Sequence, residues 1–267
     1  MLIDAHAHFY TDGSRGDWQR VNESRLEAGD RMGVTAHVAS ILGSWGMRSP
    51  VYFPSPEDVT TANDQMLALQ RAFPGKIFGY CVVNPNFTSH AVKEIDRRAK
   101  DGMVGVKLAA SRRANDPLLH PVAEAAGRHG FPVLHHIWQH RRKDWPNQEA
   151  SDGAELGQLA ERHPGTRFLL AHIGGGGDWA HTFRAVADIP NVYLDLSGSG
   201  VDVGMLEGAL GAVGAKRLVW GADITLDTGW AKLRYLESLG LSKSDMDLIR
   251  SGNARAIFPK GTFDARD

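Results

Sequence analysis

The 267-residue sequence predicts an α/β protein folded as a closed (β/α)8 barrel of the TIM type. Short apolar runs and amphipathic stretches alternate along the chain, and this pattern occurs eight times. Eight parallel strands close a barrel around an interior filled by side chains. The runs are continuously apolar, as expected for a parallel sheet covered on both faces. An open, doubly wound sheet is the alternative if the runs at 34–41 or 104–108 do not pair in the ring.

The expected strands are the short apolar runs at 2–8, 34–41, 77–83, 104–108, 132–136, 167–172, 191–196 and 217–223. Stretches long enough for the crossover that each parallel pair requires lie at 88–100, 117–129, 152–162 and 203–213. Segments near 228–239 and 243–250 predict one or two closing helices. Because the sequence shows no linker or low-complexity segment, we expect residues 1–267 to form a single barrel domain.

Loop lengths predict which end of the barrel carries the function. The connections that follow strands are long, at 9–23, 43–57 and 137–151, whereas those that enter strands are short, as at 128–131 and 163–166. In barrels of this class the active site is built from the loops that follow the strands. We therefore expect the long loops to surround a site at that end.

The composition of the chain favours a protein that acts on a small molecule. The formal net charge of −1 and a pI near 6.9 give no basic surface for a nucleic acid. No apolar run approaches the roughly 20 residues of a membrane span, and the first expected strand leaves no room for a signal peptide. We therefore expect a cytoplasmic protein that binds a small molecule, and neither a membrane nor a nucleic acid. The single cysteine, Cys81, lies in an apolar run and is expected to be buried and inert.

Histidines at strand ends predict a metal site. His6 and His8 are two residues apart in the first expected strand, so both side chains point to the same face. Their imidazoles could bind one ion at about 2.0–2.1 Å. His136, His172 and Asp223 each end a later apolar run, and a barrel would bring these ends together. The alternative is a set of structural histidines bonded to the backbone.

Several motifs together resemble the amidohydrolase superfamily and, more narrowly, its branch called amidohydrolase family 2. They are Asp4-Ala5-His6-Ala7-His8, Val104-Gly105-Val106-Lys107-Leu108, Pro132-Val133-Leu134-His135-His136, Leu170-Ala171-His172-Ile173-Gly174-Gly175, Val192-Tyr193-Leu194-Asp195-Leu196-Ser197-Gly198, Gly221-Ala222-Asp223 and Gly252-Asn253-Ala254-Arg255. The resemblance spans nearly the whole chain. It implies a (β/α)8 barrel with one divalent metal, often zinc, and an activity among lactonases, amide hydrolases and non-oxidative decarboxylases.

The resemblance also implies roles for individual residues. His6, His8 and His136 would be metal ligands, His172 a ligand or a group that polarises the substrate, and Asp223 a ligand that also handles a proton. Neutral imidazoles and one carboxylate leave a divalent ion with residual positive charge, so that a bound water can titrate near pH 7. Such ligands suit Zn²⁺ best, although Mn²⁺, Fe²⁺ and Co²⁺ tolerate them too.

Three further polar residues lie in or beside the expected strands. Lys107 is expected to be a cationic, substrate-binding residue of a site with one metal, because a lysine in an apolar strand needs a partner. Some members of the superfamily instead carboxylate this lysine to bridge two metals, and a lysine that reaches outward to solvent is the third alternative. Asp4 shares the parity of His6 and His8 but lies deeper, and we expect it to have a structural role. His135 should face the helices.

The loops predict substrate contacts. Arg112 follows the fourth expected strand, and Trp138 and Arg141 follow the fifth. Arginine matches carboxylates and tryptophan suits a flat ring, which predicts a carboxylated, cyclic substrate unless these arginines are only solvated surface groups. The aromatic residues Trp45, Tyr52 and Phe53 would form a lid or pack on a second subunit of a homodimer. The four glycines at 174–177 predict a tight turn rather than an anion cradle.

These observations favour metal-dependent hydrolysis of a small lactone, amide or ester. Decarboxylation of a small cyclic carboxylic acid on the same metal is the second hypothesis. The third is a protein that binds a metal without catalysis, and the combination of ligands with Asp223 as a proton-handling group argues against it.

Overall fold

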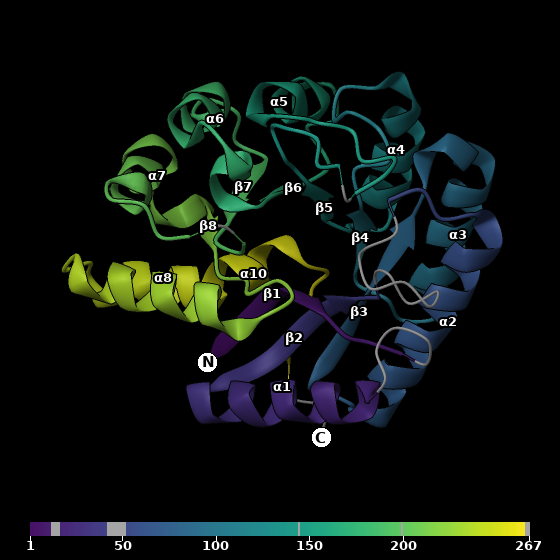
Figure 1. Ribbon diagram of the computed structural model, residues 1–267, viewed down its shortest axis with the longest axis horizontal. Helices are drawn as coiled ribbons and strands as arrows, with labels where there is room; N and C mark the ends of the chain where they lie inside the picture. Colours follow the sequence, from purple (N-terminus) through teal and green to yellow (C-terminus); the bar gives the residue numbers. More distant parts are fainter. Residues whose placement is uncertain (12–16, 42–51, 144, 199, 265–267) are drawn as a thin grey trace.

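Eight parallel strands form a ring in sequence order in the computed structural model, which describes residues 1–11, 17–41, 52–143, 145–198 and 200–264 (Figure 1). The strands are β1 (Leu2–His8), β2 (Val34–Ser40), β3 (Ile77–Val83), β4 (Gly105–Leu108), β5 (Val133–His136), β6 (Phe168–Ala171), β7 (Val192–Asp195) and β8 (Leu218–Val219). Because β2 and β4 both pair with their neighbours, the barrel is confirmed and the open sheet is excluded.

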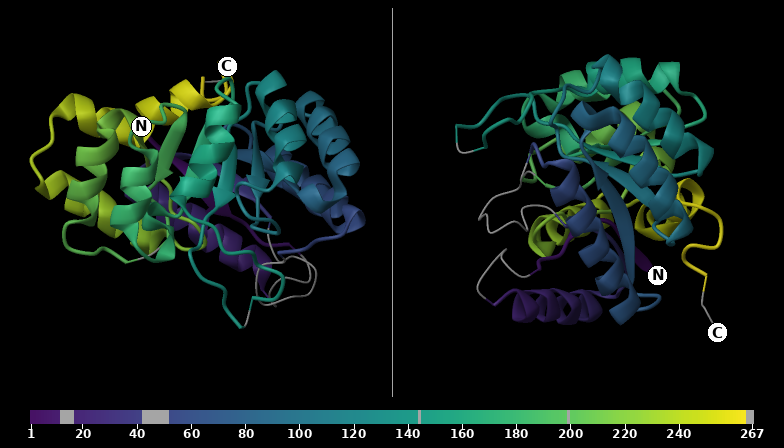
Figure 2. Two further views of the ribbon diagram at one scale, coloured as in Figure 1. Left: turned by 90° about the horizontal axis from the view of Figure 1, so that it is seen from above. Right: turned by 90° about the vertical axis from the view of Figure 1, so that its right-hand side faces the viewer.

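A helix follows each strand on the outside of the ring (Figures 1 and 2). These helices are α1 (Trp18–Met32), α2 (Pro56–Ala72), α3 (Thr88–Lys100), α4 (His120–Arg128), α5 (Gly153–Arg162), α6 (Trp179–Val186), α7 (Met205–Val213) and α8 (Leu226–Ser238). Shorter elements are η1 (Pro85–Phe87), η2 (Pro117–Leu119), η3 (Ile173–Gly176), η4 (Ala215–Arg217), α9 (Lys243–Asp247), η5 (Leu248–Gly252) and α10 (Asn253–Ile257). None of the helices in the described part of the chain combines the length and the apolar character that a membrane crossing needs.

The predicted loop 9–23 is wrong in its second half, because α1 begins at Trp18. Its N-cap residue, Asp17, accepts a hydrogen bond from the backbone N–H of Arg20. The buried face of this helix consists of Asn22, Arg25, Leu26 and Gly29. With only one large apolar residue on that face, the helix shows little hydrophobic periodicity in the sequence.

The strands pack against two apolar cores, one on each face of the sheet. The larger core lies between the sheet and the helices, and the smaller one fills the barrel with side chains that include Leu134, Leu169 and Val219. The same inner core contains Ile257 and Phe258, at the end of α10. The helix α10 lies at the end of the barrel where β1 begins, and the loop at 137–143 projects from the opposite end (Figure 2).

The barrel closes along a seam between β1 and the chain that follows β8. Only two residues of the predicted strand 217–223 pair regularly with β7. Beyond them the backbone N–H of Ala5 donates to Trp220 O at 3.0 Å, and the N–H groups of Ala222 and Asp223 both donate to His6 O. Asp223 has a φ of 65°, in the left-handed region, so that a regular strand cannot continue through it.

The pairing register of β1 is irregular between Asp4 and Ala7. Ile3 and Ala5 belong to the core inside the barrel, whereas Ala7 belongs to the core between the sheet and the helices. The expectation that Asp4 shares a face with His6 and His8 is therefore wrong. The irregularity reverses the alternation, so that Asp4 faces α1 and the two histidines face the barrel mouth.

Candidate active site

Three predicted site residues meet at the seam. His6 Nε2 lies 3.1 Å from His8 Nε2, and Asp223 Oδ1 lies 3.1 Å from His8 Nε2 and 3.6 Å from His6 Nε2. The irregular end of β1 supplies the two imidazoles, and the left-handed turn after β8 supplies the carboxylate. Ligands at about 2.0–2.1 Å from a tetrahedral ion are separated by about 3.3 Å. The three ligand atoms therefore have the spacing that a divalent ion requires.

The chemistry of these donors also fits a cation. His6 Nδ1 donates to Asp195 Oδ2 at 2.6 Å, and His8 Nδ1 donates to the backbone carbonyl oxygen of Ser40 at 3.2 Å. In a neutral imidazole only one nitrogen carries a proton, so both Nε2 atoms present lone pairs. Two lone pairs and a carboxylate oxygen that face one another form a set of ligand atoms that suits a cation.

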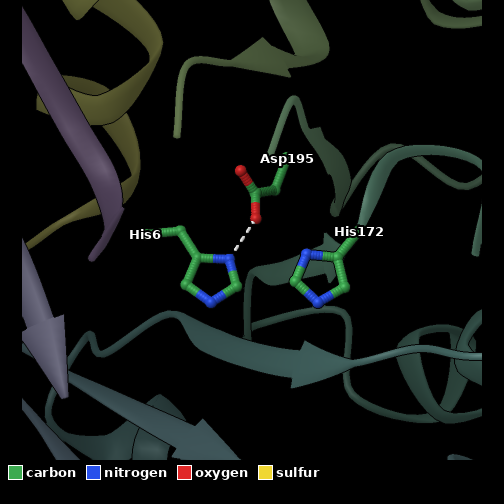
Figure 3. Close-up of side chains that lie close together, drawn as sticks. All are labelled: His6, His172 and Asp195. Atoms are coloured by element: carbon green, nitrogen blue, oxygen red, sulfur yellow. Dashed lines mark hydrogen bonds and ion pairs between the residues drawn. The ribbon is translucent and has the colours of Figure 1, made fainter. Parts of the chain in front are cut away.

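The carboxylate of Asp195 contacts His6 Nδ1, on the side of the ring opposite the candidate metal position, and so orients the ring (Figure 3). Ser197 Oγ lies 2.8 Å from the same His6 nitrogen and donates to Asp195. A carboxylate behind a histidine fixes the ring and raises its basicity as a ligand. The sequence prediction did not include Asp195 or Ser197 in the site, although Asp195 lies near the end of the expected strand 191–196.

The imidazoles are buried and uncharged. Burial lowers the pKa values of His6 and His136 well below the ordinary histidine value, and it lowers the pKa of His172 to about 4. Burial also acts to raise the pKa of Asp223, but the neighbouring imidazoles of His172, His8 and His6 outweigh it and hold this pKa well below its usual range. Neutral imidazoles beside an ionised carboxylate are the protonation states that metal binding requires.

Lys107 lies inside the barrel, so the outward-facing alternative is wrong. It is fully buried, and its Nζ lies 2.9 Å from His6 Nε2. Burial lowers the pKa of this lysine to about 8. The ammonium group therefore lies at the floor of the candidate site, next to a nitrogen that would bind the ion.

His136 lies beside His172 rather than within the group of three. Its Nδ1 is 3.2 Å from His172 Nε2, and its Nε2 is 3.4 Å from the side-chain amide of Gln148. Among the described residues, two groups have ligand atoms within 4.8 Å of one another: His6, His8 and Asp223, and His6, His172 and Asp195. His136 belongs to neither, and its role as a ligand stays a prediction.

A pocket of about 200 Å³ opens over the group of three. Its walls are largely aromatic and include the predicted Trp138, and its lining residues are His8, Tyr52, Ala109, His136, Trp138, Trp145, His172, Gly198, Asp223 and Ile224. Neither Arg112 nor Arg141 lines it, because Arg112 donates to Asn86 and Arg141 forms an ion pair with Glu149. Their substrate role stays a prediction, and Trp45 lies outside the described residues.

Two glycines allow the close packing around these side chains. A Cβ on Gly221 would lie 2.3 Å from Asp195 Oδ1, and one on Gly198 would lie 2.3 Å from His172 Nδ1. Residues 174–176 have positive φ within η3, which supports the prediction of a tight turn. His135 donates to its neighbour's backbone carbonyl at 2.9 Å and is buried, as expected for a structural residue.

Comparison with known proteins identifies the family. The model of the amidohydrolase family matches residues 3–260. The chain belongs to the amidohydrolase family. No curated protein matches this sequence. The fold of the chain resembles solved structures of enzymes, and the chain is itself an enzyme of this family.

Three solved structures illustrate the likeness. The 5-carboxyvanillate decarboxylase of Sphingomonas paucimobilis is 18% identical, with a TM-score of 0.71 over 96% of this chain and 98% of that chain. A dihydroxybenzoic acid decarboxylase of a Polaromonas species, solved with bound manganese, is 17% identical, with a TM-score of 0.71 over 96% of each chain. An amidohydrolase of Burkholderia multivorans is 14% identical, with a TM-score of 0.70 over 96% of this chain and 98% of that chain.

Proposed function

We propose that this amidohydrolase is a metal-dependent hydrolase of a small, planar lactone, amide or ester. One observation carries the proposal: the two carboxylate oxygens of Asp223 have different neighbours. Oδ1 lies 3.1 Å from His8 Nε2, whereas Oδ2 lies 3.7 Å from His172 Nδ1. One oxygen can therefore face an ion while the other handles a proton.

His6, His8 and Asp223 would hold the ion, with His136 as the further predicted ligand. A divalent ion bound there supplies Lewis acidity, which polarises an acyl oxygen and lowers the pKa of a water molecule. The side chain of Asp223 is 22% exposed and lines the pocket, so it can reach that water. Zn²⁺ and Mn²⁺ are the candidate ions, and Mn²⁺ is present in the similar Polaromonas decarboxylase.

The residues of the chain divide the proton transfers of hydrolysis between them. The Asp223 carboxylate accepts a proton from water as the oxygen of that water bonds to the acyl carbon. The same group then returns the proton to the leaving oxygen or nitrogen as the acyl bond breaks. Neutral His172 holds no positive charge to compete with the ion and can orient the substrate by a hydrogen bond.

The pocket walls define the shape of the proposed substrate. Trp138 and Trp145 lie 5.9 Å apart between ring centroids, and Tyr52 packs 5.6 Å from Trp145. Aromatic walls of this kind favour a flat molecule. No arginine lines the pocket among the described residues, so the proposed substrate has a flat ring but no arginine partner in this pocket for an attached carboxylate.

Decarboxylation of an aromatic acid is the second candidate, and the aromatic walls favour it. The similar structures from Sphingomonas and Polaromonas carry this activity, although their low identity shows only the fold. Carbon dioxide would leave, and a proton would have to be delivered to the ring carbon. We rank this reaction second because Asp223, held ionised, offers a base rather than an acid.

A panel of planar lactones, aryl esters, amides and hydroxylated benzoic acids tests both candidates. The metal-loaded enzyme is assayed for acid release with a pH indicator and for carbon dioxide with a coupled assay. Hydrolysis predicts acid release from the first three classes. Carbon dioxide release without hydrolysis would replace the first candidate by the second. Activity on none of the compounds would favour the third hypothesis, a protein that binds a metal without catalysis.

A further inference from the structure

Asp223 needs support from outside its own strand. It follows a strand of only two residues and adopts a left-handed backbone with φ 65°. Its backbone N–H donates to His6 O, but its side chain is 22% exposed and must still be held beside two imidazoles. Left-handed residues at functional sites persist where their surroundings fix them.

A buried ion pair holds the backbone on both sides of Asp223. Asp4 Oδ1 accepts a hydrogen bond from the backbone N–H of Ala222 at 3.0 Å. Arg25 Nη1 donates to the backbone carbonyl oxygen of Ile224 at 2.7 Å. Arg25 Nη2 donates to Asp4 Oδ2 at 2.9 Å, which completes the link. The residues before and after Asp223 are thus bonded to a single pair of side chains.

The same carboxylate also holds the other side of the candidate metal site. The backbone N–H of His6 donates to Asp4 Oδ1 at 3.2 Å. His37 Nδ1 donates to Asp4 Oδ2 at 3.0 Å and so restrains the carboxylate from β2. Asp4 therefore connects the backbone of one ligand, His6, to the residue that precedes another ligand, Asp223.

Burial makes this arrangement rigid. The side chains of Asp4 and Arg25 are 0% and 7% exposed. Burial acts to raise the pKa of Asp4, but the hydrogen bond from His37 and the charge of Arg25 outweigh it and lower this pKa below its ordinary value. The planar guanidinium can donate to a carboxylate and a carbonyl at once, whereas the ammonium of a lysine is a single point of charge.

We propose that Asp4 and Arg25 form a clamp that positions Asp223 and sets the distance between its carboxylate and the imidazoles of His6 and His8. Neither clamp residue lines the pocket, so both act through Asp223 as positioning residues. The inference rests on the metal site of the proposed function and does not depend on which reaction the enzyme catalyses.

The test compares Arg25→Lys with a matched control, Arg98→Lys. Arg98 is also buried, donates to Glu94 at 2.6 Å and donates to the backbone carbonyl oxygen of Thr60 at 3.1 Å. It joins α3 to α2, away from the pocket. Cobalt(II) affinity is measured by competition with a chelator, together with the visible spectrum of the bound cobalt and the melting temperature of each variant.

The clamp predicts that Arg25→Lys weakens cobalt affinity about 10- to 100-fold and changes the spectrum, as for the loss of groups that orient metal ligands. Arg98→Lys should lower the melting temperature to a similar degree with unchanged affinity and spectrum. Equal cobalt affinity in both variants and the parent would overturn the clamp. Failure of the parent to bind cobalt would instead refute the metal site on which the proposed function rests.

A milder variant, Asp4→Asn, covers the case in which Arg25→Lys does not fold. The amide keeps an oxygen for the Ala222 N–H but loses the charge that pairs with Arg25. The clamp predicts weaker cobalt binding here too, again with Arg98→Lys unchanged. If neither clamp variant folds while Arg98→Lys does, the pair serves the stability of the barrel and the positioning role is wrong.

Discussion

The two ends of the barrel are built on the same strands but differ in their side chains, which are apolar at one end and polar at the other. At the end where β1 begins, the interior is filled by an apolar core that includes Leu134, Leu169 and Phe258. At the end where the strands finish, the interior is filled by imidazoles, carboxylates and Lys107. Apolar packing stabilises the first end without specifying chemistry. The second end is polar and buried, so every group there needs a partner, and the partners determine the chemistry.

The largest difference between the two ends should appear in turnover. Asp223→Asn removes the proton acceptor of the polar end but keeps a side-chain oxygen, so metal content should fall less than activity. We expect the turnover number to drop about 10²- to 10⁴-fold, as for the loss of a general base. Steady-state kinetics with elemental analysis measures both quantities. Asp227→Asn, four residues away on α8, is the control, and unchanged turnover in Asp223→Asn would refute the proton role.

The apolar end should affect stability alone. Leu134→Ala leaves a cavity among fully buried side chains and should lower the free energy of unfolding by about 2–5 kcal/mol. The conservative change Leu134→Met should cost less than about 1.5 kcal/mol. Urea denaturation measures the loss. Metal content should equal that of the parent in both variants, and loss of metal from folded Leu134→Ala would show that the two ends are not independent.

The pH dependence of stability should come from the polar end. Burial lowers the pKa of His172 to about 4, so the folded protein keeps this imidazole neutral where the unfolded chain binds a proton. This contribution is complete above pH 6.5, the ordinary histidine value, and is lost as the pH falls toward 4. Each such histidine lowers stability by up to about 1.4 kcal/mol per pH unit.

Denaturation of metal-free protein at several pH values measures this effect. The slope between pH 6.5 and pH 4 should decrease in His172→Gln, because one group no longer titrates. The apolar variant Leu134→Met provides the matched control and should keep the slope of the parent. An unchanged slope in His172→Gln would contradict the neutral state of this imidazole.

The smallest expected effect concerns the pocket wall. Trp138→Phe keeps an aromatic face but loses area against a flat substrate, so KM should rise about 2- to 10-fold, the equivalent of one aromatic contact. The turnover number should stay the same because Trp138 handles no proton. Kinetics on whichever substrate the panel identifies measures the change. A lower turnover number with unchanged KM would place Trp138 in the chemistry instead.

The sequence predicts the barrel and much of the site because both follow from local patterns. Apolar runs mark the strands, and the parity of His6 and His8 in β1 places their ligand atoms 3.1 Å apart. The positions of Asp195 and Arg25 do not follow from local patterns. Arg25 lies on a mostly polar helix face, and its acceptors are 21 and 199 residues away in the sequence. The irregular register of β1, which turns Asp4 toward Arg25, depends likewise on closure of the seam.

Metal content tests the central claim most directly. The account predicts that the purified enzyme, loaded with zinc or manganese and then dialysed, retains about one equivalent of ion by elemental analysis. His6→Ala and His8→Ala should lose it, whereas His135→Ala, on the other face of β5, should keep it. Stoichiometric metal in folded His6→Ala and His8→Ala, or no metal in the parent, would contradict the account.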